Sequence, residues 1–151
     1  MKTGRTQSYL ALNSYTKLMR AAETVTGRVG RTMSAAGLTI SQFGVLEALH
    51  HKGALCQRDI AAKILKSTGN ITLVIDNLEK QELVTRERIS DDRRFLTIRL
   101  TGKGEALIST VFTDVEAAII AEMSVLTEDE QGTLGRLCKK LGLQEGGMES
   151  T

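Results

Sequence analysis

Four short polar side chains lie close together near the middle of the chain: Ser67, Thr68, Asn70 and Thr72, with Gly69 among them. Hydroxyl and carboxamide groups donate and accept hydrogen bonds, and glycine lets another molecule come close to the backbone. These residue types favour contact with base edges and phosphates in a DNA groove. Ser67 also has the chemistry of a helix N-cap, which would direct the free N–H groups of the first turn toward an anion.

This polar group must be positioned by a helix with one apolar face. Ile71, Val74, Ile75 and Leu78 recur at i, i+3, i+4 and i+7, the spacing of a buried helical stripe. The polar residues therefore lie on the opposite face, where a partner can reach them. A capped, solvated surface helix would show the same pattern, so the helix alone does not decide the function.

Two β-prone runs after this helix predict a hairpin. They cover residues 83–88 and 95–100, and in the second run apolar and polar residues alternate as in a half-buried strand. The sequence SDDRR between them forms a charged tip, in which an aspartate can pair with Arg94. Arginines on a two-stranded ribbon can enter a DNA minor groove, because narrow A·T-rich segments attract guanidinium groups. A solvated turn could also be charged, but a polar helix followed by this ribbon is more specific to DNA binding.

The run from Leu38 to Leu107 resembles the MarR family of winged helix-turn-helix regulators. The resemblance is carried by LTISQFGVLEAL, CQRDIAAKI, STGNITLVIDNLEKQELV and DDRRFLTIRLTGKGEAL. It implies that the helix beginning at Ser67 is the recognition helix, that Asp92 and Arg94 are the wing pair, and that the molecule is a homodimer. The residues expected to contact DNA are Lys66, Ser67, Thr68, Gly69, Asn70, Thr72, Asp92, Arg93 and Arg94.

Helical spacing predicts two further helices before this region. A long helix is expected over residues 8–36, with Gly37 as a left-handed cap. Thr39 and Gln42 stand at capping-box spacing and would open a second helix, which Gly53 ends.

The remaining elements are predicted from similar signals. Residues 54–55 suffice for a short third strand, and residues 57–65 predict a helix that supports the recognition helix. Thr101 can cap a helix that runs to about residue 126. The sequence TEDE at residues 127–130 is a second capping box, which would open a last helix ending at Gly142.

These elements predict a mainly α fold with a small β wing, in a single domain of residues 1–151. The winged helix-turn-helix region covers residues 39–100, and dimerisation helices cover residues 8–36 and 101–142. The terminal helices have more apolar positions than a small winged domain needs, so we expect them to pack against a second copy. The surplus apolar positions could also form the wall of a small-molecule cavity. A dimer interface and such a cavity can exist together.

Composition sets the broad class. The chain has 151 residues, a net charge of +2 and two cysteines, too few for a disulfide scaffold. It has no apolar run long enough to span a membrane, and its N-terminus lacks the apolar stretch of a signal peptide, so we expect a cytoplasmic protein. Residues 57–104 hold ten Lys+Arg against seven Asp+Glu, a balance of +3, while the rest of the chain balances at −1. The positive charge is therefore concentrated in the proposed reading region.

Cysteine and histidine allow a redox or metal site, but a simpler interpretation exists for each. Cys56, at the start of a helix, could be a sensor of oxidants or electrophiles. A small residue tucked between strand and helix is the favoured alternative, and Cys138 is expected in the core. His50 and His51 are adjacent and are expected on different sides of their helix, so zinc would lack a set of four ligands. We expect no metal and no cofactor.

The sequence contains no nucleophile with a base and an orienting group and no glycine-rich phosphate loop, so an enzyme is not expected. The favoured function is a dimeric transcriptional repressor on a pseudo-palindromic DNA operator. The alternative is a winged-helix scaffold for protein contacts that does not bind DNA.

By resemblance, a small aromatic or phenolic effector would bind between the winged region and the dimerising helices and release the DNA. The sequence STGNITLVIDNLEK also resembles the subgroup that responds to quinones and other electrophiles. Tyr15, Met19, Phe43, His50 and Phe112 could line the effector cavity, although ordinary core residues would show the same helical spacing.

Overall fold

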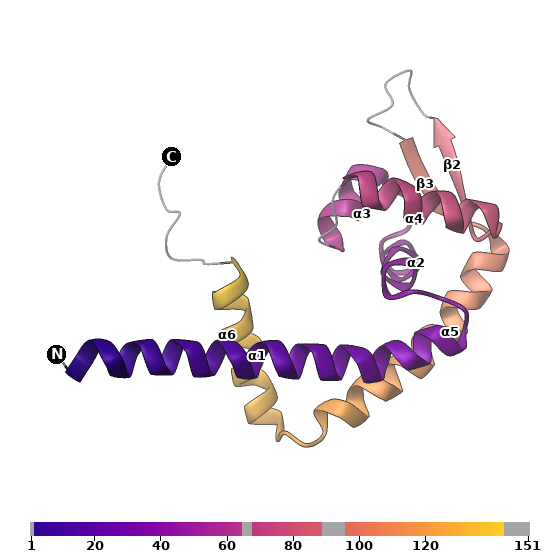
Figure 1. Cartoon of the computed structure of the whole chain (residues 1–151). Helices are drawn as coiled ribbons and strands as arrows, with labels where there is room; N and C mark the ends of the chain where they lie inside the picture. The colour runs from indigo at the N-terminus through magenta and orange to yellow at the C-terminus, as the bar shows by residue number, and fades with distance from the viewer. Residues whose placement is uncertain (1, 65–67, 89–95, 144–151) are drawn as a thin grey trace.

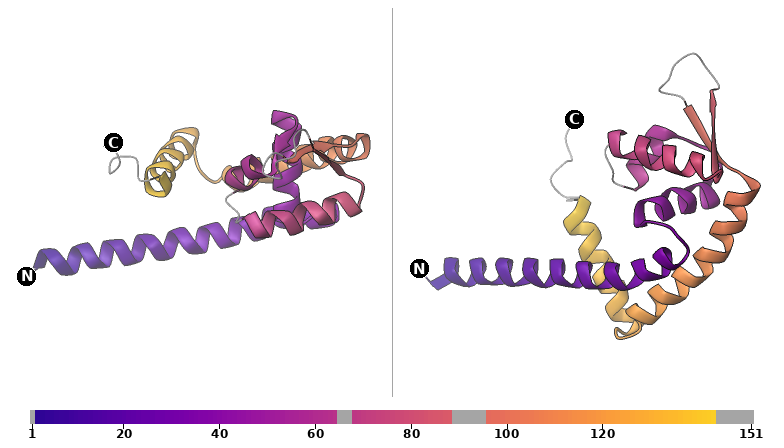
Figure 2. Two further views of the ribbon diagram at one scale, coloured as in Figure 1. Left: turned by 90° about the horizontal axis from the view of Figure 1, so that it is seen from above. Right: turned by 45° about the vertical axis from the view of Figure 1, so that its right-hand side comes forward.

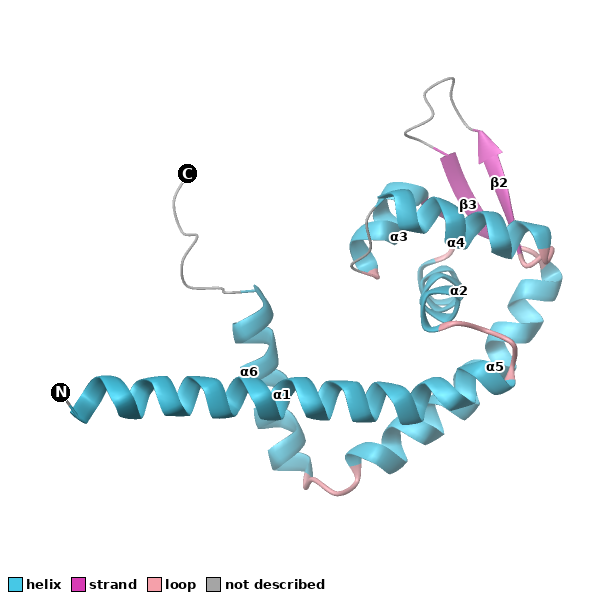
Figure 3. Ribbon diagram, viewed as in Figure 1, coloured by secondary structure: helices cyan, strands magenta, loops and turns pink. Residues whose placement is uncertain are grey.

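The computed structural model describes residues 2–64, 68–88 and 96–143 (Figure 1). Within these ranges the chain is mostly helical, with a small antiparallel sheet, as the sequence predicts (Figure 3). The elements in order are α1 (Lys2–Ala35), α2 (Ile40–Lys52), β1 (Leu55–Cys56), α3 (Gln57–Lys63), α4 (Thr68–Lys80), β2 (Val84–Arg88), β3 (Leu96–Leu100), α5 (Gly102–Met123) and α6 (Glu128–Leu143).

The winged region lies at one end of the molecule, while α1 extends far beyond it and α5 leads away from it toward α6 (Figures 1 and 2). In the sheet β3 lies between β1 and β2, and both of its neighbours are antiparallel to it. Ile98 pairs with Leu55 on one side and with Arg86 on the other. The short strand after α2 is therefore a true third strand of the wing sheet.

One hydrophobic core joins the winged region to the long helices. Its fully buried side chains come from α2, α3, α4, β2, β3 and α5, and the end of α1 packs against them. Burying a side chain of the size of Leu or Ile contributes about 1.5–3 kcal/mol relative to leaving it exposed. The fully buried large side chains are Leu46, Ile60, Ile71, Ile75, Leu78, Ile98, Ile108, Val45, Val84 and Val115.

The predicted helix ends are confirmed by their hydrogen bonds. The Thr39 hydroxyl accepts from the Gln42 N–H at 3.1 Å and the Gln42 side chain accepts from the Thr39 N–H at 3.0 Å, a complete capping box. Thr101 caps α5 by accepting from the Gly104 N–H at 3.0 Å. Gly37 and Gly53 both have φ of 77°, in the left-handed region that favours glycine.

A tight backbone contact joins the turn before β2 to the start of α5. A Cβ built at Gly104 would lie 2.0 Å from the carbonyl oxygen of Leu83. That oxygen accepts a hydrogen bond from the Thr101 N–H at 3.1 Å, and the Thr101 hydroxyl donates to the Glu82 carbonyl at 2.6 Å. The wing is thereby anchored to α5, and only glycine fits at residue 104.

Several predicted boundaries differ from the structure. The first helix begins at Lys2 instead of residue 8, the short strand is Leu55–Cys56 instead of residues 54–55, and α3 ends at Lys63 instead of residue 65. The shifts of the short strand and of α3 are small because capping residues are local signals. The start of the first helix is farther from its prediction because no capping residue marks it in this polar segment.

One prediction about the core is wrong. Cys138 is exposed, because α6 buries none of its residues against the rest of the chain. Its apolar face remains uncovered in the single chain. Within the described residues, none of the helices is both long and apolar enough to cross a lipid bilayer.

Candidate nucleic-acid interface

The helix α4 has the two faces that its sequence predicts. Ile71, Ile75 and Leu78 are fully buried and Val74 is half-buried, while Asn70 is exposed together with Thr72 on the solvent side. The apolar stripe fixes α4 on α2 and α3, so its outer face is held by the core rather than by local propensity alone.

Part of the predicted interface lies outside the described residues. This applies to Lys66, Ser67 and the wing tip with Asp92, Arg93 and Arg94. Thr68 and Gly69 belong to the first turn of α4, where only the backbone is described. Their contacts with DNA stay predictions.

Arg86 connects the wing to the recognition helix. From β2 its guanidinium reaches Asp76 at 2.5 Å and Glu79 at 3.2 Å, both on α4. It also donates to the Thr72 carbonyl oxygen at 3.3 Å, and the Arg86 backbone N–H donates to the Glu79 carboxylate at 3.2 Å. The cation compensates two carboxylates that would otherwise repel a phosphate backbone. The arrangement therefore holds the wing and the helix in one orientation and reduces negative charge beside the outer face of α4.

The start of α3 also touches α4. The Gln57 side chain donates to the Thr72 hydroxyl at 2.6 Å, which links the two helices of the helix-turn-helix on their exposed side. Cys56 precedes Gln57 as the N-cap residue of α3, is half-buried and makes no side-chain capping hydrogen bond. Thr72, predicted as a DNA contact, thus has a structural partner within the protein.

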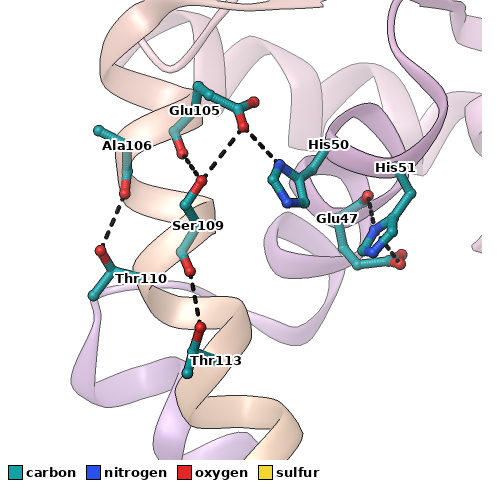
Figure 4. Close-up of polar contacts among 8 residues, drawn as sticks. All are labelled: Glu47, His50, His51, Glu105, Ala106, Ser109, Thr110 and Thr113. Atoms are coloured by element: carbon teal, nitrogen blue, oxygen red, sulfur yellow. Dashed lines mark hydrogen bonds and ion pairs between the residues drawn. The ribbon is translucent and has the colours of Figure 1, made fainter.

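The rings of the two adjacent histidines lie close to each other, although each pairs with a different carboxylate (Figure 4). Their ring centroids are 5.1 Å apart, and the His51 ring lies 4.9 Å from the ring of Phe112 on α5. His50 Nδ1 is 2.8 Å from Glu105 Oε1 on α5, while His51 Nδ1 is 3.0 Å from Glu47 Oε1. Neighbouring positions on a helix differ by only about 100°, so both rings can lie near Phe112 on α5.

The five residues predicted to line an effector cavity are not gathered in one place. Phe43 is buried in the core, and His50 lies beside Phe112. Tyr15 is 63% exposed and lines an apolar groove of about 670 Å³ between α1 and α6, and Met19 is exposed on α1.

A second cavity lies between α2 and the end of α3. Its volume is about 410 Å³. Its walls combine apolar side chains with charged groups: Ile40, Ser41, Gly44, Glu47, Ala48, His51, Lys52, Lys63 and Ile64. Across residues 2–64, 68–88 and 96–143, no group of three or more His, Cys, Asp or Glu side chains could hold a metal ion.

Comparison with known proteins identifies this arrangement. The sequence model of the MarR family matches residues 38–95. The HTH-type transcriptional regulator MhqR of Bacillus subtilis (strain 168) is 35% identical to this chain over 133 residues, which are 88% of this chain and 92% of MhqR. The chain belongs to the MarR family.

Solved MarR-like structures support the same assignment. The Bordetella bronchiseptica protein BpsR, whose DNA binding is regulated by 6-hydroxynicotinic acid, is 25% identical with a TM-score of 0.79, over 86% of this chain and 98% of BpsR. NadR in complex with 4-hydroxyphenylacetate is 26% identical with a TM-score of 0.69, over 83% of this chain and 89% of NadR. The resemblance noted from the sequence is confirmed, and this MarR-family chain is a transcriptional regulator rather than an enzyme.

Sequence reasoning missed Arg86, which joins the wing strand β2 to α4 in this MarR-family chain. Only a weak signal was available: an arginine in the first wing strand, with acidic residues in the last turns of the preceding helix. To predict that Arg86 pairs with these acidic residues, one must know how β2 lies against α4. The alternation of apolar and polar residues in the strand does not give this.

Proposed function

We propose that the chain is a homodimeric repressor that binds a pseudo-palindromic operator in the cytoplasm and releases it when a small aromatic or phenolic ligand, or an electrophile, is present. The observation that carries the DNA-binding part is the exposed polar face of α4 next to the wing, with Arg86 compensating Asp76 and Glu79 between them. A helix of this kind fits a major groove, and the wing tip with Arg94 would enter the adjacent minor groove.

The proposal of a dimer is supported by the uncovered apolar side chains of α1, α5 and α6. Single exposed apolar residues are ordinary, but a contiguous set on three helices marks an interaction surface. A second copy related by a two-fold axis would cover this surface and hold two α4 helices at a fixed spacing. The residues are Tyr9, Leu10, Leu12, Tyr15, Met19, Ile119, Ile120, Leu134, Leu137, Leu141 and Leu143.

The proposal of a ligand is supported by the cavity between α2 and α3. Ile40 and Ile64 give it apolar walls, while Lys52 and Lys63 give it cations. An aromatic ring with a carboxylate or phenolate group suits such a lining, because the ring packs on the apolar side chains and the anion pairs with an ammonium group. The two similar regulators described above are associated with aromatic carboxylic acids of this size.

A ligand there could act on the DNA through α5. His51 lines the cavity and packs against Phe112, and α5 connects the wing to α6. A ligand that binds one arrangement of these helices more tightly shifts the population toward that arrangement. The shifted arrangement would hold the two α4 helices at a spacing that no longer fits successive major grooves.

The central experiment is selection of bound sequences from random duplex DNA, followed by a salt titration on the selected duplex. Phosphate contacts require log K to fall linearly with log[salt], with a slope of about 0.9 per phosphate contacted. Enrichment of an inverted repeat with half-sites about 10–10.5 bp apart would support the operator. Failure to enrich any sequence, with no salt dependence, would instead favour the protein-contact scaffold.

Release is tested on the same duplex. Addition of 4-hydroxyphenylacetate or 6-hydroxynicotinate to the wild type and to Lys63→Ala tests the cavity, and addition of a quinone to the wild type and to Cys56→Ser tests the thiol. Loss of the small-molecule response in Lys63→Ala, with DNA affinity kept, would support the cavity. Loss of the quinone response in Cys56→Ser would assign release to the thiol.

A further inference from the structure

Leu73 is an apolar side chain in the middle of the polar face of α4. It is 62% exposed, whereas the other leucine of that helix, Leu78, is fully buried. Positions three before and four after it are Asn70 and Asn77, both exposed. On a helix such positions are neighbours along one ridge, so Asn70, Leu73 and Asn77 form one exposed ridge of α4.

The wing covers the neighbouring flank of the helix but not this ridge. Arg86 contacts Thr72, Asp76 and Glu79, which lie along one side of α4. The core covers the opposite face through Ile71 and its neighbours. The ridge of Asn70, Leu73 and Asn77 is therefore the part of α4 that faces away from the core, beside the flank that binds the wing.

An exposed leucine at this place adds little to the stability of the fold. Its side chain has most of its surface in water, and helix propensity alone would be served equally by alanine. Leu73 also lies in the N-terminal half of α4, the half that contacts base edges when such a helix enters a major groove. Of the groups that bases present in the major groove, the thymine C5-methyl is the apolar one.

We propose that Leu73 is a specificity-determining residue that packs against thymine methyl groups in each half-site, flanked by hydrogen bonds from the carboxamides of Asn70 and Asn77. This inference rests on the proposed function, because it requires α4 to enter the major groove. It adds the chemistry of the base that the ridge selects: a thymine under Leu73, beside bases that offer hydrogen-bonding edges to the two asparagines. Adenine suits an asparagine through its N6 and N7 groups.

The test removes the methyl group from the DNA and the side chain from the protein separately. A duplex is first selected from random DNA by the wild-type protein, and each thymine of the half-site is then replaced by deoxyuridine, which lacks only the C5-methyl. Dissociation constants are measured for wild type, Leu73→Ala and the conservative variant Leu73→Met. All variants are expected to fold, and circular dichroism checks this.

At one thymine per half-site, deoxyuridine should raise the Kd of the wild type about fourfold, the factor that corresponds to about 0.8 kcal/mol for one buried methyl group. Leu73→Met should retain this sensitivity. Leu73→Ala should bind the thymine and deoxyuridine duplexes equally, and random selection with it should no longer fix a thymine at that position. The difference between the two proteins isolates the contact, because any effect of deoxyuridine on DNA shape is common to both.

Equal deoxyuridine sensitivity in wild type and Leu73→Ala, or none at any thymine, would overturn the role of Leu73 while leaving the operator and the salt dependence intact. If no duplex is selected by the wild type at all, the proposed function fails first, and the two failures are thereby distinguished.

Discussion

The guanidinium of Arg86 on β2 lies 2.5 Å from a carboxylate oxygen of Asp76 on α4, and the Arg86 side chain is only 19% exposed. This ion pair joins the two elements that the proposed function brings to DNA together, the wing and α4. The same guanidinium also binds Glu79, so a single side chain sets both the angle of the wing and the local charge.

Replacing Arg86 by alanine should lower both stability and DNA affinity. The two carboxylate partners are about two-fifths exposed, so solvent screening limits the loss of stability to about 1 kcal/mol. Affinity for DNA should fall further, because Asp76 and Glu79 would then face the phosphates without a cation. Urea unfolding and binding to the selected duplex measure the two effects.

Arg99→Ala is the matched control for this prediction. Arg99 stands in the same sheet and pairs with Glu87 at 3.5 Å, with both side chains about half exposed. Its removal should change stability by less than about 0.5 kcal/mol. Equal losses of stability in the Arg86 and Arg99 variants would mean that the contact of Arg86 with α4 contributes no more to stability than an exposed ion pair does.

A second prediction concerns Gly104. Alanine at this position would place its Cβ against the Leu83 carbonyl oxygen, so the turn before β2 or the start of α5 must move. We expect a loss of about 3 kcal/mol in the free energy of unfolding, as for other severe overpacking. Gly102→Ala is the control, because no described heavy atom lies within 4 Å of a Cβ built there. A Gly104→Ala protein as stable as the Gly102→Ala protein would contradict the contact.

The parts of the structure that follow from the sequence are those set by local chemistry. The capping residues Thr39 and Thr101, and the glycines that end helices, act within a few residues of themselves, so their roles are visible in the sequence. The alternation of the second wing strand and the apolar stripe of α4 likewise report burial directly.

The parts that could not be predicted depend on contacts between distant segments or between molecules. Arg86 finds its partners only once β2 is laid beside α4, and the histidine rings come near Phe112 only once α5 packs beside α2. Cys138 lies on an apolar stripe that predicts burial, but none of the described residues 2–64, 68–88 and 96–143 buries it. The apolar stripe alone does not distinguish a core from an interface.

The capping box of α6 predicts a pH dependence in acid. Hydrogen bonds from the backbone N–H and the hydroxyl of Thr127 hold the pKa of Glu130 below its usual value of 4.5. A depressed folded pKa stabilises the folded form above the unfolded value, and this contribution is lost as pH falls through the folded value. The first turn of α6 should therefore fray as the pH falls below 4.5 and through the lowered pKa of Glu130, with faster amide hydrogen exchange.

Glu130→Gln provides the comparison for the acid transition. Glutamine keeps the geometry of the box but does not titrate, so the onset of faster exchange at the start of α6 as the pH falls below 4.5 should be lost. A pH profile in the variant identical to that of the wild type would assign the transition to another group.

Substitutions at Asn70 and Arg94 should have different effects, the first on the recognition of bases and the second on the attraction to the DNA backbone. Asn70→Ala should relax the preference for particular base pairs, at a cost of about 1–3 kcal/mol at those positions. Arg94→Ala should weaken binding to all selected sequences alike and reduce the salt slope by about 1. Competition with duplexes carrying single base changes measures the first effect, and salt titration measures the second. If neither variant changed the operator affinity, α4 and the wing would not be the reading elements.

The proposed dimer predicts a distinct behaviour for Leu137, which is 59% exposed on α6. An aspartate there would place a charge in the apolar interface between copies, so Leu137→Asp should sediment as a monomer while the chain keeps its helical content. Its affinity for a two-half-site operator should drop sharply, because one copy can fill only one half-site.

Arg136→Asp introduces the same charged side chain at the adjacent position, on the opposite side of α6 from the apolar stripe, where Arg136 donates to the Thr133 hydroxyl at 3.1 Å. This variant should remain dimeric and keep its affinity for the operator, since its side chain would stay in water. Sedimentation velocity at several concentrations distinguishes the two variants. A Leu137→Asp protein that remained dimeric would show that α6 is not part of the interface, and the uncovered groove beside Tyr15 on α1 would then need another occupant.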